Sequence, residues 1–174
     1  MDCHIFTKPV FTDSRGYFVE QFNCEKDTFG FQIKQISESV SLPHVFRGFH
    51  FQIKNKMNKI MRVVTGKVQV YTLDLLLSTP ILKSFELSSI NYTKNLVQYL
   101  YVPSHYAVGF ITLEDTRMQY FHDEVRSEHS RSINIESVKE QVPLINYIHI
   151  LSDADKNAMS WTEWKSLNEE QWLL

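Results

Sequence analysis

The side chains in this sequence with types suited to moving protons include His50, Lys59, Tyr120 and Asp155. A hydrogen on the carbon beside a ketone is acidic only because its removal places charge on the carbonyl oxygen. Moving that hydrogen takes a base, a group that stabilises the oxyanion and an opposing acid. A neutral imidazole, an ammonium group and a phenol are three suitable types, and a carboxylate can orient an imidazole and raise its basicity.

Each of these residues also has a structural alternative. A histidine in a strand is usually a hydrogen-bonded core or surface residue, and Tyr120 fits ordinary packing across neighbouring strands. Lys59 fits a solvated surface, and Asp155 fits the first turn of a helix, where the macrodipole favours a carboxylate. The elements that carry the four residues must therefore bring them together before they can act as one site.

Those elements are mostly strands, because much of the chain follows a period of two. Residues 12–16, Thr-Asp-Ser-Arg-Gly, have the turn chemistry of a hairpin, and Thr65-Gly66 predicts a second tight connection. Many short strands joined by regular turns are typical of a sandwich or a barrel. The predicted strands span residues 5–10, 17–23, 45–53, 59–64, 67–77, 84–87, 96–102, 107–113 and 117–125.

The C-terminal segment, about residues 152–174, has helical character instead. Ser152 predicts the cap of a short helix that includes Asp155, and residues 160–172 are the best helical candidate in the chain. We expect a stripe at roughly helical spacing there to pack on the strands or on a neighbouring subunit. The stripe consists of Trp161, Trp164, Leu167 and Trp172.

The strand predicted over residues 45–53 raises a question of side-chain direction. In ideal alternation Gly48, His50 and Gln52 share one face, whereas Arg47 lies on the other. Arg47 and His50 therefore enter one pocket only if the strand is irregular between them. Gly48 is a suitable position for a β-bulge, which would bring both side chains to the same side.

Composition limits the partners. A chain of 174 residues fits one domain, residues 1–174. Lys and Arg total 18 against 20 Asp and Glu, so the formal net charge is −2 and nucleic acid is not an expected partner. Two cysteines are too few for a disulfide framework, which favours a reducing cytoplasm. With no signal-peptide pattern and no apolar run of membrane-spanning length, we expect a soluble cytoplasmic protein without a membrane partner.

Three separated segments resemble one family. Residues 11–22, FTDSRGYFVEQF, match F-x-D-x-R-G-x-F-x-E-x-F, and residues 45–52, VFRGFHFQ, match R-G-x-H-x-Q. A lysine and a V-x-x-G hairpin follow, and residues 150–156, ILSDADK, match L-S-x-x-D. In this order and spacing the segments resemble the dTDP-4-dehydrorhamnose 3,5-epimerase family of cupin-fold nucleotide-sugar epimerases. The resemblance implies an all-β fold, a cupin-type jelly-roll β-barrel with short C-terminal helices.

The resemblance also implies roles for individual residues. It makes His50 the general base, Asp155 the carboxylate paired with it, and Tyr120 the acid on the other face of the sugar. The implied substrate contacts are Gln35, Arg47, Gln52 and Lys59, together with Arg15, Phe18 and Glu20, which in the family close the site of the partner subunit. The implied assembly is a homodimer that exchanges an N-terminal hairpin, residues 1–23.

The chain departs from the family pattern at several positions. Where the family has A-H-G-F, residues 107–110 have Val108 in place of the histidine, and Ser37 replaces an asparagine. The family's paired tyrosines, one of which lies against the nucleotide base, correspond to Val125 and Arg126 or their neighbours. The proposed proton-transfer groups are retained. We therefore hypothesise that the nucleotide or the sugar differs from dTDP-4-keto-6-deoxyglucose, with inversion of one carbon as an alternative to both.

The implied function is epimerisation at C3, C5 or both of a nucleotide-linked 4-keto-6-deoxyhexose, in deoxysugar and surface-polysaccharide biosynthesis such as that of lipopolysaccharide O-antigen. No cofactor is expected. Many cupins hold a metal on clustered histidines, but His50 is followed by Phe51 and Gln52 with no second histidine two positions away, so no metal is expected either.

Two other functions stay open. A 3,4-ketoisomerase on the same fold ranks second, because those relatives resemble R-G-x-H-x-H more than the R-G-F-H-F-Q of this chain. A catalytically silent nucleotide-sugar-binding cupin is the other, suggested by Val108 and the missing tyrosines. Among nucleotides, dTDP, CDP, GDP and UDP are all compatible with the sequence.

Overall fold

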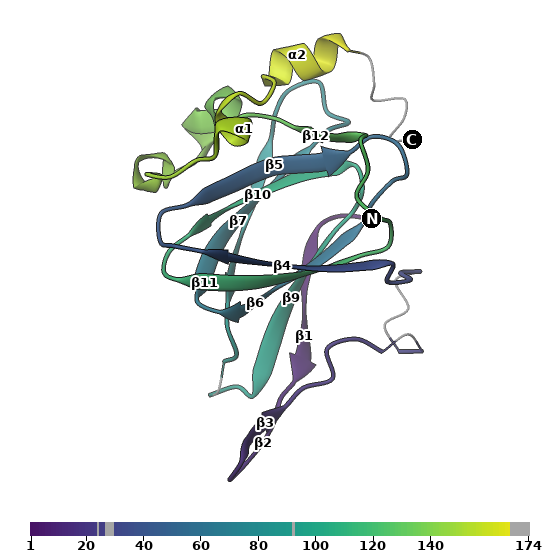
Figure 1. The fold of residues 1–174 in the computed structure, drawn as a ribbon, viewed down its shortest axis with the longest axis vertical. Coiled ribbons are helices and arrows are strands. Elements are labelled where there is room, and N and C mark those ends of the chain that lie inside the picture. The colour runs from purple at the N-terminus through teal and green to yellow at the C-terminus, as the bar shows by residue number, and fades with distance from the viewer. Residues whose placement is uncertain (24, 27–29, 92, 168–174) are drawn as a thin grey trace.

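Two five-stranded antiparallel sheets face each other and form the body of the protein (Figure 1). The structure, a computed structural model, describes residues 1–23, 25–26, 30–91 and 93–167. The first sheet has the order β1-β9-β6-β11-β4, and these strands span His4–Pro9, Leu96–Val102, Lys59–Thr65, Thr116–His122 and Gln35–Ser41. The second has the order β12-β5-β10-β7-β8, spanning Ser130–Ser132, Phe46–Gln52, Tyr106–Thr112, Lys67–Asp74 and Leu82–Ser88.

Apolar side chains from the inner faces of both sheets form the core between them. One buried cluster joins Met61, Val63 and Leu100 of the first sheet to Val70 and Phe110 of the second. Strands β9 and β10 are buried along most of their length, as expected for strands covered on both faces. Strand β10 pairs with β5, and β6, which lies beside β9, pairs with β11. Strands β5 and β11 carry the candidate base and acid.

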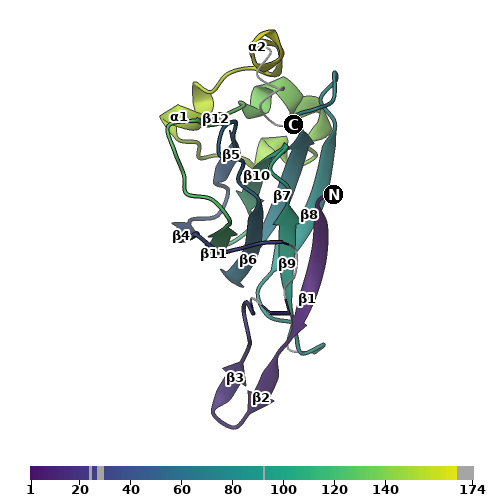
Figure 2. The same cartoon turned by 90° about the vertical axis from the view of Figure 1, so that its right-hand side faces the viewer.

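The N-terminal hairpin lies apart from the sheets. Strands β2, Phe11–Asp13, and β3, Gly16–Phe18, pair only with each other and project from the end of the molecule opposite the helices (Figures 1 and 2). The strand predicted over residues 17–23 therefore ends early. The chain leaves the hairpin after Phe18 because Val19 and Phe22 turn to pack against the first sheet.

Short helices cover the second sheet. They are two 3₁₀ helices, Ile135–Gln141 and Ile145–Tyr147, and two α-helices, α1, Asp153–Lys156, and α2, Trp161–Ser166. Trp161 and Trp164 are buried, and Trp164 meets Phe51 of β5 edge-on at 4.8 Å between ring centroids, so this part of the predicted stripe packs on the strands. Leu167 is half exposed. Of the helix predicted over residues 160–172, α2 covers Trp161–Ser166, and residues 168–172 lie outside the described part of the chain.

Strand β4 was not predicted because its pattern of polar and apolar residues is the reverse of that in an ordinary core strand. Its inward positions are polar, Gln35, Ser37 and Ser39, whereas Ile36 and Val40 are 60% and 64% exposed. Strand β12 is short and polar and was missed as well. The strands predicted over residues 67–77 and 117–125 end earlier than expected, at Asp74 and His122.

The expected fold class is confirmed in its main features, an all-β jelly roll with short C-terminal helices. Among the described residues, however, the strand ladders form two sheets and do not close into a continuous barrel. None of the described helices is long and apolar enough to cross a membrane.

Candidate active site

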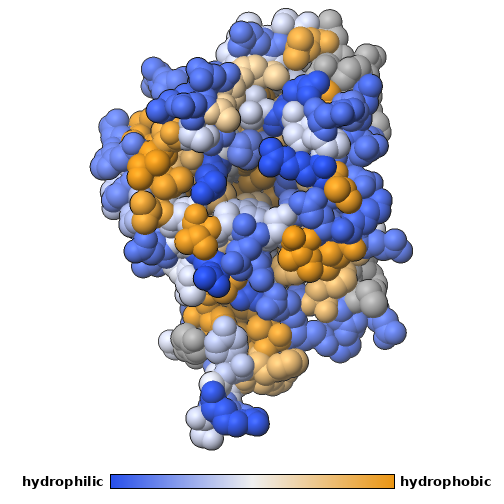
Figure 3. Space-filling view, viewed as in Figure 1, coloured by the Kyte–Doolittle hydropathy of each residue, from blue (hydrophilic) through white to orange (hydrophobic). Residues whose placement is uncertain are grey.

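A cavity of about 380 Å³ lies between the sheets. Figure 3 shows its mouth as a hollow near the middle of the face, bordered by hydrophilic residues. The first sheet contributes Gln35, Ser37, Ser39, Lys59, Met61, Tyr120 and His122. The second contributes Arg47, His50, Phe51, Gln52, Val108, Phe110, Ser130, Arg131 and Ser132, and Met57, Arg126 and Ala154 complete the lining.

Strand β5 is irregular at Gly48, and this brings Arg47 and His50 into the same cavity. Their pairing partners on β10 lie two positions apart, whereas Arg47 and His50 lie three apart, so β5 contains one extra residue. Gly48 has φ +133°, and a Cβ added there would overlap Cα of Gly109. Only glycine fits this backbone and this close approach. The predicted bulge is confirmed, and both side chains line the cavity.

His50 is paired with a buried carboxylate. Its Nε2 lies 2.8 Å from Oδ1 of Asp155 on α1, and because a carboxylate only accepts, Nε2 carries the proton and Nδ1 is left to accept one. Burial would raise the pKa of Asp155, but hydrogen bonds from His50, Ser152 and the Gly48 backbone lower it below its ordinary value. Asp155 therefore stays ionised and fixes the imidazole tautomer.

Tyr120 of β11 lies on the opposite wall. Its hydroxyl is 2.7 Å from Oγ of Ser39, and its ring lies within the inner face of the first sheet. Burial raises the pKa of Tyr120 to about 12, against smaller lowering effects of the Ser39 hydrogen bond and the Arg47 charge. The phenol is therefore protonated at neutral pH and is able to donate a proton.

Lys59 supplies a buried positive charge between these walls. Its Nζ donates a 2.9 Å hydrogen bond to the backbone oxygen of His50, although the residue is only 8% exposed. Burial, followed by the charge of Arg126, lowers the pKa of Lys59 to about 8. Arg47 is oriented by a 2.9 Å hydrogen bond from Nε to Oγ of Ser41. Two cations thus line the cavity, and groups of this kind can stabilise an oxyanion.

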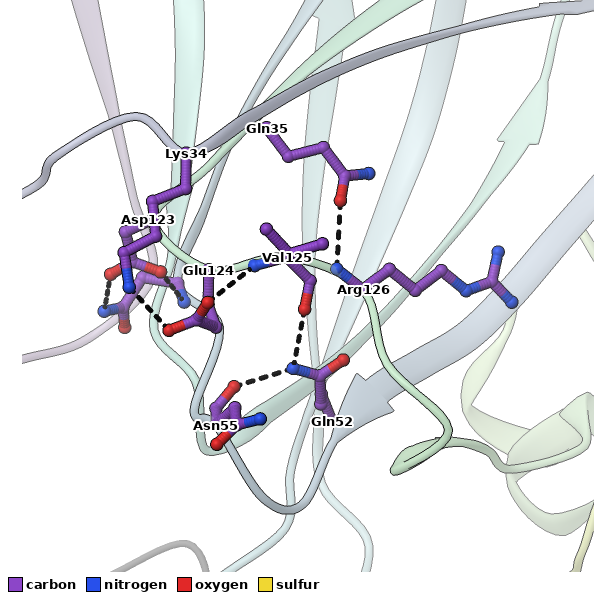
Figure 4. A network of polar contacts seen from close by, with 9 residues as sticks. Lys34, Gln35, Gln52, Asn55, Asp123, Glu124, Val125 and Arg126 are labelled. Atoms are coloured by element: carbon purple, nitrogen blue, oxygen red, sulfur yellow. Dashed lines mark hydrogen bonds and ion pairs between the residues drawn. The ribbon is translucent and has the colours of Figure 1, made fainter.

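Gln35 and Gln52 line the cavity and also hold the loop that follows β11. Oε1 of Gln35 accepts a hydrogen bond from the Arg126 backbone, and Gln52 donates to the oxygen of Val125 (Figure 4). Gln52 also accepts a hydrogen bond from the Ser127 backbone. Figure 4 shows the Arg126 side chain extending away from this network. The two glutamines therefore fix the backbone that presents Arg126.

Three predicted site residues lie elsewhere in this chain. Arg15, Phe18 and Glu20 belong to the projecting hairpin or the residue stretch just after it, and none lines the cavity. Arg15 instead forms a 2.6 Å ion pair with Asp13 at the exposed turn. The resemblance assigns these residues to the site of a partner subunit, and that role stays a prediction.

The cavity is strongly cationic although the chain is not. Arg47, Lys59, Arg126 and Arg131 all line it, and none of the described lining residues is acidic. The formal net charge of the whole chain is −2, so the excess of positive charge belongs to the cavity and not to the chain as a whole. Such a pocket attracts an anionic ligand. Within the described residues, no group of three or more His, Cys, Asp or Glu side chains is arranged to hold a metal ion.

Comparison with known proteins shows the family of the chain. The family model described as dTDP-4-dehydrorhamnose 3,5-epimerase matches residues 1–163. The chain belongs to this family of isomerases. Curated relatives with that name include proteins from Methanothermobacter thermautotrophicus, 30% identical over 66% of this chain, and from Shigella flexneri, 28% identical over 93%.

The extent of these matches differs. The alignment spans 63% of the Methanothermobacter protein, less than two thirds, but 92% of the Shigella protein. A crystal structure of the Bacillus anthracis dTDP-4-dehydrorhamnose 3,5-epimerase with TDP and PPi bound is 27% identical, with a TM-score of 0.79. That comparison covers 91% of this chain and 94% of the other.

The departures from the dTDP-4-dehydrorhamnose 3,5-epimerase pattern cluster in the cavity. Val108 pairs with His50 across β5 and β10, so the missing histidine changes the wall beside the candidate base. Ser37 pairs with Tyr120 and lines the other wall. Arg126, one of the positions to which the resemblance assigns the family's paired tyrosines, also lines the cavity.

Several lining residues were not singled out from the sequence. Ser39 holds the Tyr120 hydroxyl, and Ser130 and Ser132 of β12 border His50 and Gln52 in register. The signal that could have found Ser39 is the polar alternation of β4, in which every second residue is a small or polar one facing inward. Arg131 had no comparable signal, because its strand is only three residues long.

Proposed function

We propose that this protein is an epimerase that inverts C3, C5 or both of a nucleotide-linked 4-keto-6-deoxyhexose without a cofactor. The observation that carries the proposal is the arrangement of two proton-transfer groups on opposite walls of one cavity. His50, backed by Asp155, comes from β5 of one sheet, and Tyr120 comes from β11 of the other. Inversion needs removal of a proton on one face of the sugar and its return on the other.

Each residue has a chemical task in this proposal. Nδ1 of His50 accepts the proton from the carbon beside the ketone, and Asp155 stabilises the imidazolium that forms. The electron pair moves to the carbonyl oxygen, where the cationic groups of Lys59 and Arg47 stabilise it. Tyr120 then donates its proton to the same carbon from the opposite face, so the carbon is inverted and the ketone is restored.

The positive charge of the cavity supports a substrate that carries a nucleoside diphosphate group. Arg126 and Arg131 line the cavity in addition to the two cations assigned to the oxyanion. Guanidinium groups bind phosphate oxygens through paired hydrogen bonds. The departures at Val108, Ser37 and Arg126 support a substrate that differs from dTDP-4-keto-6-deoxyglucose in its nucleotide or its sugar.

The proposal includes a homodimer that exchanges the N-terminal hairpin. Phe11 and Phe18 of the hairpin are 61% and 67% exposed, and β4 is an edge strand whose outward residues Ile36 and Val40 are exposed as well. A long edge strand with an apolar outer surface favours pairing with another chain. Exchange would carry Arg15 toward the cavity of the partner. We place the activity in cytoplasmic deoxysugar biosynthesis, in pathways such as that of lipopolysaccharide O-antigen.

Proton exchange in deuterated water tests the function. The protein is incubated with dTDP-, CDP-, GDP- and UDP-linked 4-keto-6-deoxyhexoses, and NMR follows C3 and C5. Deuterium at either carbon together with inverted configuration is the expected result. Migration of the carbonyl would indicate a 3,4-ketoisomerase instead, and binding without exchange would indicate a silent binding protein. Equal turnover of dTDP-4-keto-6-deoxyglucose at both carbons would contradict the proposal that the substrate differs from this compound.

A further inference from the structure

His122 is a second histidine in the cavity, with surroundings unlike those of His50. It ends β11, where it pairs with Lys59 on β6 and with Gln35 on β4. Its side chain shares the inward face with Tyr120, and the two rings stack with centroids 6.3 Å apart at an interplanar angle of 20°. The residue is 8% exposed and lines the cavity.

One edge of the His122 ring is enclosed and the other meets the cavity. Nδ1 is buried and has no hydrogen-bond partner among the described residues. A buried polar atom without a partner costs free energy that an apolar ring of the same shape would avoid. Phenylalanine would fill this place beside Tyr120 without that cost. The imidazole therefore has a use beyond packing, and the edge that carries Nε2 is the one available to a ligand.

The surroundings of His122 disfavour its protonated form, which argues against a role as a second general base. His50 bonds a carboxylate, whereas His122 pairs across β11 and β6 with Lys59, whose positive charge acts on the ring. Burial, followed by the charge of Lys59, lowers the pKa of His122 to about 4. The ring is therefore neutral at pH 7, with one donor and one acceptor nitrogen. A neutral imidazole suits an uncharged hydroxyl group, while the arginines of the cavity suit phosphate.

We infer that His122 is a specificity-determining residue whose Nε2 hydrogen-bonds a hydroxyl of the sugar ring, between the acid Tyr120 and the cation Lys59. The inference rests on the proposed function, since it takes a sugar nucleotide as the ligand of this cavity. The contact holds the sugar and takes no part in proton transfer. It acts equally on the ground state and on the transition state, so it governs binding rather than the chemical step.

Binding measurements with stable ligands test the inference without requiring turnover. Calorimetry compares dTDP-glucose, UDP-glucose, CDP-glucose and GDP-glucose with the corresponding nucleoside diphosphates for wild type, His122→Phe and His122→Gln. Phenylalanine keeps the ring and removes both nitrogens, whereas the glutamine amide reaches the position of Nε2. We expect His122→Phe to weaken binding of the best sugar nucleotide about tenfold, the effect of about one hydrogen bond. Binding of the nucleoside diphosphate should not change.

The outcomes separate this inference from the proposed function. His122→Gln should restore most of the sugar-nucleotide affinity, and thermal unfolding should show that both variants are folded. In turnover, His122→Phe should raise KM while kcat and its pH profile stay as in the wild type. Equal affinity of wild type and His122→Phe, an equal loss for the nucleoside diphosphate, or no binding of any sugar nucleotide to the wild type overturns the inference. A wild type that binds in this selective way but exchanges no proton overturns the epimerase proposal alone.

Discussion

Lys59 and His50 are joined by a hydrogen bond, in which Nζ of Lys59 donates to the backbone oxygen of His50 over 2.9 Å. The two residues come from β6 and β5, which belong to different sheets. This bond therefore bridges the two walls of the cavity. It fixes the cation relative to the backbone of the candidate base.

Replacing Asp155 with Asn should slow proton abstraction. The amide is nearly isosteric, but it removes the negative charge and lets the imidazole adopt the wrong tautomer. We expect kcat to fall by ~10²–10⁴ with little change in KM, as for loss of general base catalysis. Steady-state kinetics with the best substrate of the nucleotide panel measures this. A kcat within threefold of wild type would contradict the role of Asp155.

The free energy of unfolding at low pH should also depend on the carboxylate of Asp155. Hydrogen bonds hold the pKa of Asp155 below its ordinary value of 3.8 in the folded state, against the opposing effect of burial. Its stabilisation is therefore complete above the unfolded pKa and is lost as pH falls through the lower, folded pKa. Urea unfolding between pH 6 and pH 2 should show a flatter acid decline for Asp155→Asn than for wild type. Parallel declines would contradict this linkage.

Tyr120→Phe should separate exchange from inversion. His50 still removes the proton and can return a deuteron to the same face, but no acid remains on the opposite face. We expect deuterium incorporation to continue while inversion falls by ~10²–10⁴. Ser39→Ala, which removes only the hydroxyl bonded to Tyr120, is the control and should retain inversion with a smaller loss. Full inversion by Tyr120→Phe would exclude this tyrosine as the acid.

The decline of kcat/KM at alkaline pH should depend on Arg126. Burial and the charge of Arg126 lower the pKa of Lys59 to about 8, so kcat/KM should decline as pH rises through that value. Arg126→Gln removes a repelling charge, which should raise the pKa of Lys59 and move the decline to higher pH. The pH profile of kcat/KM measures the shift. An alkaline limb that stays in place would show that Lys59 does not control it.

Gly48→Ala should destabilise the fold and misplace the site. A new Cβ would overlap Cα of Gly109 and lie 2.8 Å from the oxygen of Val108. Gly16→Ala is a matched control, because Gly16 has φ +130° but open space around the new methyl group. We expect Gly48→Ala to cost at least about 2 kcal/mol more than Gly16→Ala in urea unfolding. Equal costs would mean that the bulge tolerates a side chain.

The sequence was most informative where chemistry and backbone geometry coincide. Side chains alternate between the two faces of a strand, so Arg47 and His50 could share a pocket only if the strand over residues 45–53 was irregular. The bulge lies at Gly48, as predicted. The pairing of His50 with Asp155, 105 residues apart, followed only from the family resemblance. No local pattern contains such a long-range contact.

Other features could not be predicted from local sequence patterns. Strand β4 alternates regularly, but its polar residues face the cavity and its apolar residues face outward, which is the reverse of an ordinary core strand. The roles of Arg15, Phe18 and Glu20 depend on a second chain, which a single sequence does not position. The sequence places His122 on the same strand face as Tyr120, which indicates a position beside it in the pocket, but its pairing with Lys59 depends on how β6 and β11 meet.

Deuterium incorporation by His50→Asn is the most direct test of the account. The variant and wild type are incubated in deuterated water with the preferred 4-keto sugar nucleotide, and His149→Asn, a histidine outside the cavity lining, serves as the control. The account predicts substrate binding by all three proteins, deuterium at C3 or C5 with wild type and His149→Asn, and a rate lower by ~10²–10⁴ with His50→Asn. Exchange at the wild-type rate in His50→Asn would contradict it.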